Sequence, residues 1–351
     1  MSYQNGLAAI NLEMPGIVPR TEYSAHMHRD LVLRVTGIDI AGADQATKQR
    51  ATSAFIKAWD YGMYWNVLTH SHVFGDKRTR MGHAVFAADG SDFTDQISAL
   101  FAEPEDVYAF DMFENFGKRD KSLLTAQYDA DYDRQRALYP DTVAMTGIYI
   151  TCVSGLIELL GWDTLLCAAG IDAAKFGAFT NRYCDWILQY FEALAASKAP
   201  VVMVHDDIVW GNGPFLAPEF YRTFVFNNYH RLLRPLLDAG KKIIYTADGN
   251  FTAFIDDIAA CGVHALVMEP GTDMALAAER YGNKLALIGN ADTSKLLFGT
   301  RADIETEVRR CMDIGKKCPG FMMAVGNHIP PNTPVENALW YDECYRKYAR
   351  R

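Results

Sequence analysis

The feature that most constrains the fold is a regular alternation between short apolar segments and longer amphipathic ones. The short segments are rich in β-branched residues, as buried parallel strands are, and the longer ones show a helical period. Strands are predicted at 62–67, 107–112, 142–145, 201–206, 242–246, 264–269, 284–290 and 321–326. Helices are predicted at 44–59, 92–101, 121–138, 155–197 (in two or three pieces), 218–239, 251–261, 275–281, 303–317 and 335–349. Strands that are each followed by helix predict an α/β fold of the (β/α)8, or TIM, barrel type.

The chain length of 351 residues fits one such barrel with additions. We expect residues 1–45 to form an irregular N-terminal extension packed on the barrel, and residues 46–351 to form a single barrel domain. A long loop after the first strand, 69–91, would overhang the catalytic face, because the loops that follow barrel strands lie there. An open, doubly wound sheet is the alternative fold, but no Gly-rich phosphate turn follows the first strand.

Charge and composition narrow the choice of partners. The net charge of −9 argues against nucleic acid, because a phosphate backbone needs a basic face. The first 30 residues lack the apolar core of a signal peptide, and no apolar run reaches membrane-spanning length. The seven cysteines contain no C-x-x-C pair and are expected to be reduced thiols. We therefore expect a cytoplasmic protein that acts on a small molecule.

The stretch 201–218 places three polar residues at the end of a buried strand. His205, Asp206 and Asp207 follow the apolar run VVMV, and a loop rich in Gly and Pro comes next. Two adjacent carboxylates repel each other, so one must be paired, solvated or protonated. Either the group is functional, or Asp206 caps the loop while Asp207 faces water.

The same pattern recurs at the ends of five successive strands. These strands end at His205, Asp206, Asp207, Thr246, Asp248, Glu269, Asn290, Asp292, Asn327 and His328. In a barrel such residues converge on one mouth. Carboxylates with imidazole suit a divalent metal ion or general acid–base catalysis, although the usual zinc signatures are absent. The predicted catalytic residues are His205, Asp206 and Asp207, and the predicted metal ligands are Asp248, Glu269 and His328.

A second set of residues is expected to bind the substrate. Histidines of the 69–91 loop would face it, and aromatic side chains would line an apolar pocket. As alternatives, His70 and His72 could be a pair of metal ligands, and the aromatic residues could belong to the barrel core without binding substrate. The predicted substrate-binding residues are Trp65, His70, His72, His83, Phe113, Trp210 and Asn290.

Four segments of the carboxyl-terminal part of the chain resemble the uroporphyrinogen decarboxylase superfamily. They are HDD followed by GPFLAPEFYR, then YTADGN, then LIGNADTSKLLFGT, and finally VGNHIPPNTPVEN. Their spacing along the chain is similar as well. The resemblance implies a (β/α)8 barrel with its active site at the strand carboxyl ends.

The superfamily has two known chemistries. One branch decarboxylates the acetate side chains of a tetrapyrrole without a cofactor, but its R-Q-A-G-R type segment has no match in residues 1–45. The other branch comprises corrinoid-dependent methyltransferases, of which those using coenzyme M hold zinc through H-x-C and a further Cys. The corresponding positions here are Thr246, Asp248 and Asn327. The resemblance therefore argues against a thiolate zinc site and leaves open an oxygen-rich one.

The leading hypothesis is a methyltransferase of the O-demethylase type. It would take a methyl group from a small methoxylated or methylated compound, with an aryl methyl ether favoured, and pass it to the Co(I) of a corrinoid protein. The expected cofactors are a divalent metal such as Zn²⁺ and cobalamin carried by that partner, and a homodimer is also considered. The alternatives are a cofactor-independent decarboxylase or lyase, and a non-catalytic binding subunit.

Overall fold

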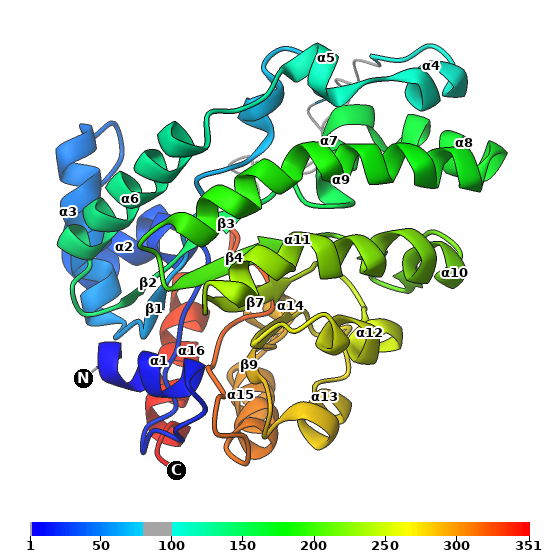
Figure 1. The fold of residues 1–351 in the computed structure, drawn as a ribbon. Coiled ribbons are helices and arrows are strands. Elements are labelled where there is room, and N and C mark those ends of the chain that lie inside the picture. The colour runs from blue at the N-terminus through cyan, green and yellow to red at the C-terminus, as the bar shows by residue number, and fades with distance from the viewer. Residues whose placement is uncertain (1, 80–99) are drawn as a thin grey trace.

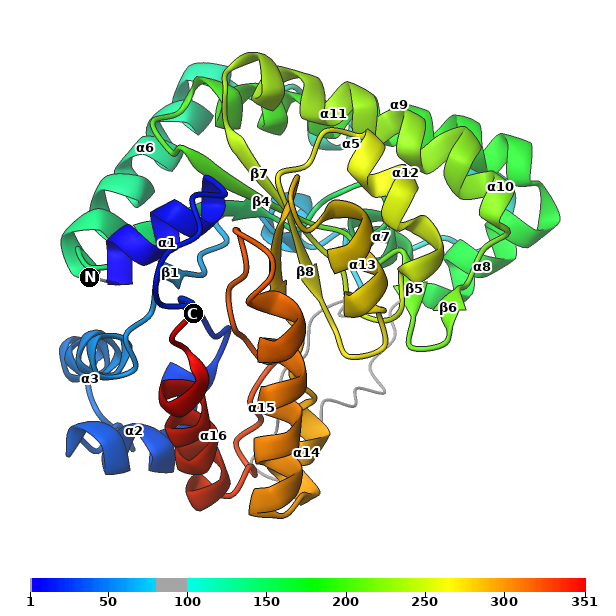
Figure 2. The ribbon, with the colours of Figure 1, turned by 90° about the horizontal axis from the view of Figure 1, so that it is seen from below.

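The computed structural model of the chain describes residues 2–79 and 100–351. It has an α/β fold in which helices flank a parallel sheet (Figure 1 and Figure 2). The strands are β1 (Met63–Tyr64), β2 (Val143–Ala144), β3 (Thr146–Ile148), β4 (Val201–His205), β5 (Val209–Trp210), β6 (Gly213–Pro214), β7 (Lys242–Thr246), β8 (Ala265–Met268) and β9 (Ala286–Gly289). The helices up to β4 are α1 (Ser2–Ile10), α2 (Arg29–Thr36), α3 (Gln45–Ala58), α4 (Pro104–Ala109), α5 (Met112–Phe116), α6 (Lys121–Leu138), α7 (Ser154–Leu160), α8 (Trp162–Ile171) and α9 (Ala173–Ala196). Those after β4 are α10 (Pro218–Phe220), α11 (Phe226–Asp238), α12 (Ile255–Ala260), α13 (Met274–Tyr281), α14 (Thr293–Phe298), α15 (Arg301–Gly315) and α16 (Val335–Tyr348).

The central sheet has five parallel strands in the order β3-β4-β7-β8-β9. The predicted strands at 201–206, 242–246, 264–269 and 284–290 are confirmed as β4, β7, β8 and β9. A separate parallel pair joins β1 to β2. The predicted strand 321–326 pairs with its neighbour only through isolated bridges, from Met322 to Ile288 and from Val325 to Ala291. The parallel α/β fold is therefore confirmed, and closure into an eight-stranded barrel stays a prediction.

Alternate residues of the sheet strands enter two different apolar cores. Val201 and Met203 of β4 join a core with the inward side chains of the other strands, whereas Val202 and Val204 join the core shared with the helices. Since side chains of a strand point to opposite faces in turn, both faces of β4 are buried. This explains the run of consecutive apolar residues by which the sequence reveals these strands.

The predicted strand 107–112 is wrong. Its residues form the end of α4 and the start of α5. Helix α4 begins with Pro104 in its first turn and a capping box between Glu103 and Asp106, and α5 begins after the N-cap Asp111. These local signals favour helix over strand. The segment also lacks the two-sided burial of β4, because only Val107 and Met112 are buried.

The N-terminal 45 residues are not irregular, since they contain α1 and α2. Helix α2 begins where the side chain of His28 accepts a hydrogen bond from the Leu31 amide and ends at Gly37, which has a left-handed φ of 73°. Between α1 and α2, Arg20 forms isolated parallel bridges to both Tyr61 and Met323. This segment therefore lies between the residues around Tyr61 and those around Met323. The predicted domain boundary at residue 45 stays a prediction.

Most of the predicted helices are confirmed. Lys121–Leu138 is present as α6 with the predicted bounds, and the long region 155–197 is divided into α7, α8 and α9. The predicted helix 92–101 lies almost entirely outside the described residues. Among the described residues, no single helix is long and apolar enough to cross a membrane, and α7 and α8 meet that test only together, with a bend of 105° between them.

Candidate functional site

The carboxyl ends of the parallel strands gather the polar residues that follow them. β4 ends at His205 and β7 ends beside it at Thr246, because these two residues pair in the parallel register. The loop after β7 then passes close to the β5–β6 hairpin at Gly249, where φ is 82° and a Cβ atom would lie 2.6 Å from the Trp210 carbonyl oxygen. Only glycine fits this approach, so the turn brings Asp248 beside the end of β4.

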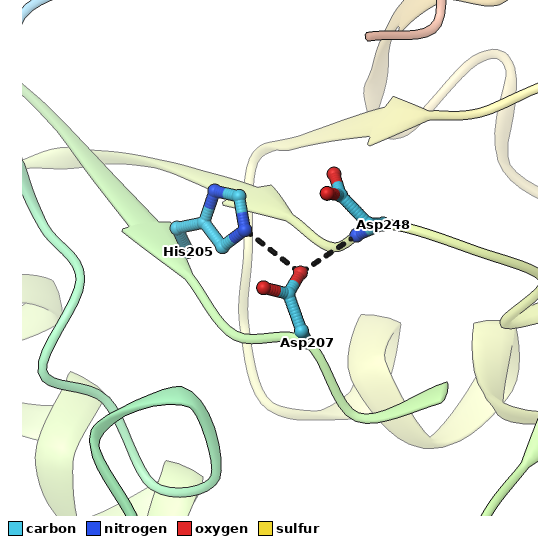
Figure 3. Close-up of side chains that lie close together, drawn as sticks. All are labelled: His205, Asp207 and Asp248. Carbon is cyan, nitrogen blue, oxygen red and sulfur yellow. Dashed lines mark hydrogen bonds and ion pairs between the residues drawn. The ribbon is translucent and has the colours of Figure 1, made fainter. Parts of the chain in front are cut away.

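His205, Asp207 and Asp248 form the centre of the site (Figure 3). His205 Nε2 lies 2.7 Å from Asp207 Oδ1, and the same oxygen accepts a hydrogen bond of 2.9 Å from the Asp248 amide. His205 is buried, and Asp207 and Asp248 are partly buried. The carboxylate of Asp207 therefore holds both the imidazole and the loop after β7 in place.

The electrostatics of the cluster favour protonated groups. Burial alone would lower the pKa of His205, but the neighbouring carboxylates, Asp207 first, raise that pKa to about 9. Burial and the charge of Asp207 raise the pKa of Asp248 to about 7, although His205 opposes this. Near neutral pH, His205 is thus an imidazolium and Asp248 holds a proton for part of the time.

Asp206 differs from its neighbour Asp207 because it is fully buried and its carboxylate serves the fold. It accepts hydrogen bonds from the amides of Val153 (2.8 Å) and Ser154 (2.6 Å) and from the Tyr229 hydroxyl (2.6 Å). Ser154 Oγ in turn accepts a hydrogen bond of 2.7 Å from the Asp207 amide. Asp206 therefore fixes the start of α7 against the end of β4, and Asp207 is left to face the cluster.

Glu269 and Asn290 also hold loops in place. Glu269 Oε2 accepts a hydrogen bond of 2.6 Å from the Gly249 amide, and its Oε1 accepts one of 2.5 Å from Asn327. Asn290 is buried and donates to the carbonyl oxygens of Glu269 (3.2 Å) and Thr272 (3.1 Å). The binding of substrate by Asn290 stays a prediction.

The cluster has the donor set of a metal site. One nitrogen or oxygen atom from each of His205, Asp207 and Asp248 lies within 4.8 Å of the other two. His205 Nε2 is the ring nitrogen that faces the carboxylates, and it would bind an ion only after losing its proton. An imidazole with two carboxylates suits Zn²⁺ or a similar divalent ion, so the residues fit such an ion. Of the predicted ligands, only Asp248 belongs to this group, and Glu269 and His328 lie outside it.

Aromatic rings surround the cluster on the side of the N-terminal segment. The ring of Tyr149 lies 4.2 Å from that of His205, and Tyr23 stacks on Trp65 at 4.4 Å. The ring of His328 lies 5.8 Å from that of Tyr23. Burial, and then the charge of His205, lowers the pKa of His328, so this imidazole is neutral. Trp65 and His328 are among the predicted site residues, whereas Tyr23 and Tyr149 are not.

For the other predicted substrate-binding residues, binding stays a prediction. The rings of His70 and His72 are 4.3 Å apart, and His72 lines a cavity beside α6. Phe113 is 44% exposed on α5, and Trp210 is 49% exposed on the β5–β6 hairpin, where it packs on Trp162. His83 lies outside the described residues.

Comparison with known proteins places the chain among its relatives. The family described as "Uroporphyrinogen decarboxylase (URO-D)" matches residues 141–348. Among curated relatives, the uroporphyrinogen decarboxylase of Pelobacter propionicus is 28% identical over 175 residues, which are 50% of this chain and 50% of that protein. That of Syntrophotalea carbinolica is 31% identical over 172 residues, 49% of this chain and 48% of that protein. The chain thus spans about half the length of the curated relatives it matches.

A similar solved structure supports the fold over the whole chain. A methyltransferase from Methanosarcina mazei superposes with a TM-score of 0.67 at 16% identity, covering 99% of this chain and 98% of that one. At this identity the likeness concerns the fold alone. The family match includes β4, β7, β8 and β9 and every residue of the His205–Asp207–Asp248 cluster. This chain therefore belongs to the uroporphyrinogen decarboxylase family.

Proposed function

We propose that the chain is a methyltransferase that demethylates a small methoxylated or methylated compound, with an aryl methyl ether as the favoured donor. The observation that carries this proposal is the His205–Asp207–Asp248 cluster, in which proton-bearing groups lie beside aromatic rings. An aromatic wall suits a ring-bearing donor, and the acids suit an oxygen leaving group.

The chain's own residues would handle the proton of this reaction. When the methyl–oxygen bond breaks, both bonding electrons stay on the phenolate oxygen, which leaves more readily if it receives a proton. Asp248 has a pKa of about 7, close to the pH at which a general acid works best. Asp207 keeps the protonated His205 oriented, and Asp206 with Ser154 keeps Asp207 in position.

Two bound groups complete the proposal. A divalent ion held by His205, Asp207 and Asp248 would displace the protons of His205 and Asp248, and it would then replace Asp248 as the acid by polarising the ether oxygen. A reduced corrinoid on a partner protein would supply the nucleophile that accepts the methyl group. We expect that partner to approach at the carboxyl ends of the parallel strands, where the cluster lies.

We further infer that the strands close into a barrel. The bridges of Met322 and Val325 continue the sheet beyond β9, and Arg20 joins Met323 to Tyr61, next to β1. Thr69, in the segment after β1, bridges to Ile148 of β3, so the N-terminal strand pairs are connected to the central sheet. These bridges support a ring, and a ring would place the strand ends around one mouth.

Methyl transfer from methoxybenzoates to reduced free cobalamin, followed in the visible spectrum, tests the proposal. We expect transfer by the wild type and a loss of about 100-fold or more in rate for Asp248→Asn, since general acids commonly contribute that much. Asp313→Asn is the matched control, because Asp313 is an exposed carboxylate on α15. No spectral change with a broad panel of methyl donors, or equal rates for both variants, would contradict the proposal.

Decarboxylation is the second candidate, favoured by the names of the curated relatives. It would require cationic groups to hold the carboxylates of the substrate. The cations expected to do this are Lys77, Arg78 and Arg80 of the loop after β1. Lys77 donates to Asn115 (2.8 Å) and Arg78 to Ser71 (2.8 Å), and Arg80 lies outside the described residues. Release of carbon dioxide from uroporphyrinogen by the wild type, without methyl transfer, would favour this candidate. Absence of both reactions would favour the non-catalytic subunit.

A further inference from the structure

A cavity of about 750 Å³ lies outside the strand-end cluster, between the segment after β1, the start of α6 and Tyr190 of α9. Its size is in the range of small-molecule sites. We propose that this cavity binds a small carboxylate that carries an apolar or aromatic body. The inference does not depend on the proposed function, because none of the cluster residues lines the cavity.

The carboxylate would bind to Arg119. The Nε of Arg119 donates to the Tyr190 hydroxyl (2.8 Å) and its Nη2 donates to the Val73 carbonyl oxygen (2.9 Å), which fixes the plane of the guanidinium group. Its Nη1 has no acceptor, and no carboxylate forms an ion pair with it, among residues 2–79 and 100–351. The guanidinium group also lies 5.5 Å from the centre of the Trp186 ring, and a ligand carboxylate could supply the counter-ion that the described residues do not.

The surroundings of His72 show that positive charge reaches the cavity. Burial lowers the pKa of this lining histidine first, and the charges of Arg78 and Arg119 lower it further. His72 is therefore neutral near pH 7 and can offer a hydrogen bond without adding charge. Asp120 is the acidic residue of the lining, but its Oδ1 accepts hydrogen bonds from the amides of Ser122 and Leu123 at the start of α6.

The rest of the lining suits an apolar body. Leu68, Val73, Leu123 and Leu124 contribute aliphatic surface. Leu123 is 64% exposed and presents apolar surface to the cavity. The hydroxyls of Thr69 and Tyr128 lie 2.5 Å apart and satisfy each other. The cavity therefore offers one cationic group, the Nη1 of Arg119, and a mostly apolar wall. These features suit an amphipathic anion better than phosphate or a sugar.

The cavity wall is also continuous with the strand-end cluster. The carbonyl oxygen of Thr69 accepts a hydrogen bond of 2.8 Å from the Tyr149 amide. The ring of Tyr149 in turn packs at 4.2 Å on that of His205. The two sites are therefore distinct in their lining but adjacent in the fold.

Isothermal titration of the purified chain with benzoate tests the inference. We expect saturable binding of one benzoate to the wild type, and at least tenfold weaker binding of the uncharged analogue benzyl alcohol. Arg119→Met should weaken benzoate binding at least tenfold. Lys118→Met is the matched control, because Lys118 is the exposed neighbour of Arg119 and does not line the cavity. It should bind like the wild type.

A second pair of variants separates this site from the proposed catalytic one. Leu124→Asp places a negative charge in the apolar wall and should also weaken benzoate binding at least tenfold, without removing any contact of Arg119. Asp248→Asn should leave unchanged the benzoate binding that Arg119→Met weakens. Loss of binding in Asp248→Asn, equal effects of Arg119→Met and Lys118→Met, or no saturable binding by the wild type would each overturn the inference.

Discussion

Replacement of Asp206 by alanine tests whether this buried carboxylate holds the site together. The change removes the acceptor of the Val153 and Ser154 amides and of the Tyr229 hydroxyl. Each buried donor left without a partner costs about 1–3 kcal/mol. Part of this cost is offset, since burial disfavours the carboxylate itself and raises its pKa to about 6. We expect Asp206→Ala to lower the free energy of unfolding by about 3–5 kcal/mol.

Asp206→Asn should cost less, about 1–2 kcal/mol, because its remaining oxygen can still accept from both amides. The assay is urea unfolding followed by circular dichroism, with free energies compared at equal slope. Asp273→Ala is the control, since the exposed Asp273 accepts from the Leu276 amide alone, at 3.0 Å, as the N-cap of α13. That loss should be about 1 kcal/mol. If Asp206→Ala cost no more than this control, Asp206 would not hold the start of α7.

Three further predictions concern other parts of the molecule. Burial lowers the pKa of His26 to about 4, below its unfolded value, so stability should fall as the pH drops from about 6.5 to 4; His26→Gln should reduce this slope in pH-dependent thermal unfolding, and substitution of the exposed His230 should not. A Cβ atom at Gly155 would lie 1.8 Å from the Tyr183 hydroxyl, so Gly155→Ala should lower the free energy of unfolding in urea by about 2–3 kcal/mol. A Cβ atom at Gly170 would have no neighbouring atom within 4 Å among the described residues, so Gly170→Ala should be neutral or stabilising. Zinc at 100 times its Kd should raise the free energy of unfolding by about 2.7 kcal/mol, a shift that a chelator or Asp248→Asn should abolish in thermal melts; equal melting with zinc and with chelator would argue against the metal site.

The sequence predicted four of the five central strands because these four are buried on both faces, but the predicted strand 142–145 stops short of β3. In β4, β7, β8 and β9 an apolar run ends at, or is directly followed by, a polar residue, and no local signal competes with that pattern. The segment 107–112 failed because a short apolar run looks alike in a strand and in a short helix. The capping residues Glu103 and Asp111 could have decided the matter.

Prediction of the site was limited by contacts between distant residues. The strand-end rule brought His205, Asp207 and Asp248 together, but it could not tell Asp206 from Asp207, because the amides that bind Asp206 lie 52 and 53 residues away. Tyr149 follows β3 and the same rule could have found it. Tyr23 gave no such signal, since it stands in a segment that was expected to be irregular.

The pairing of Arg20 has a consequence for how the chain folds during its synthesis. Its segment contacts residues that are made much later: Arg20 bonds Asp342 across 322 positions, and Ser24 bonds Ile329 across 305. Contacts of such long separation form slowly, because a large loop must close first. During synthesis these two contacts can therefore form only after Ile329 and Asp342 have been translated, whereas the bridge from Arg20 to Tyr61 needs no such delay.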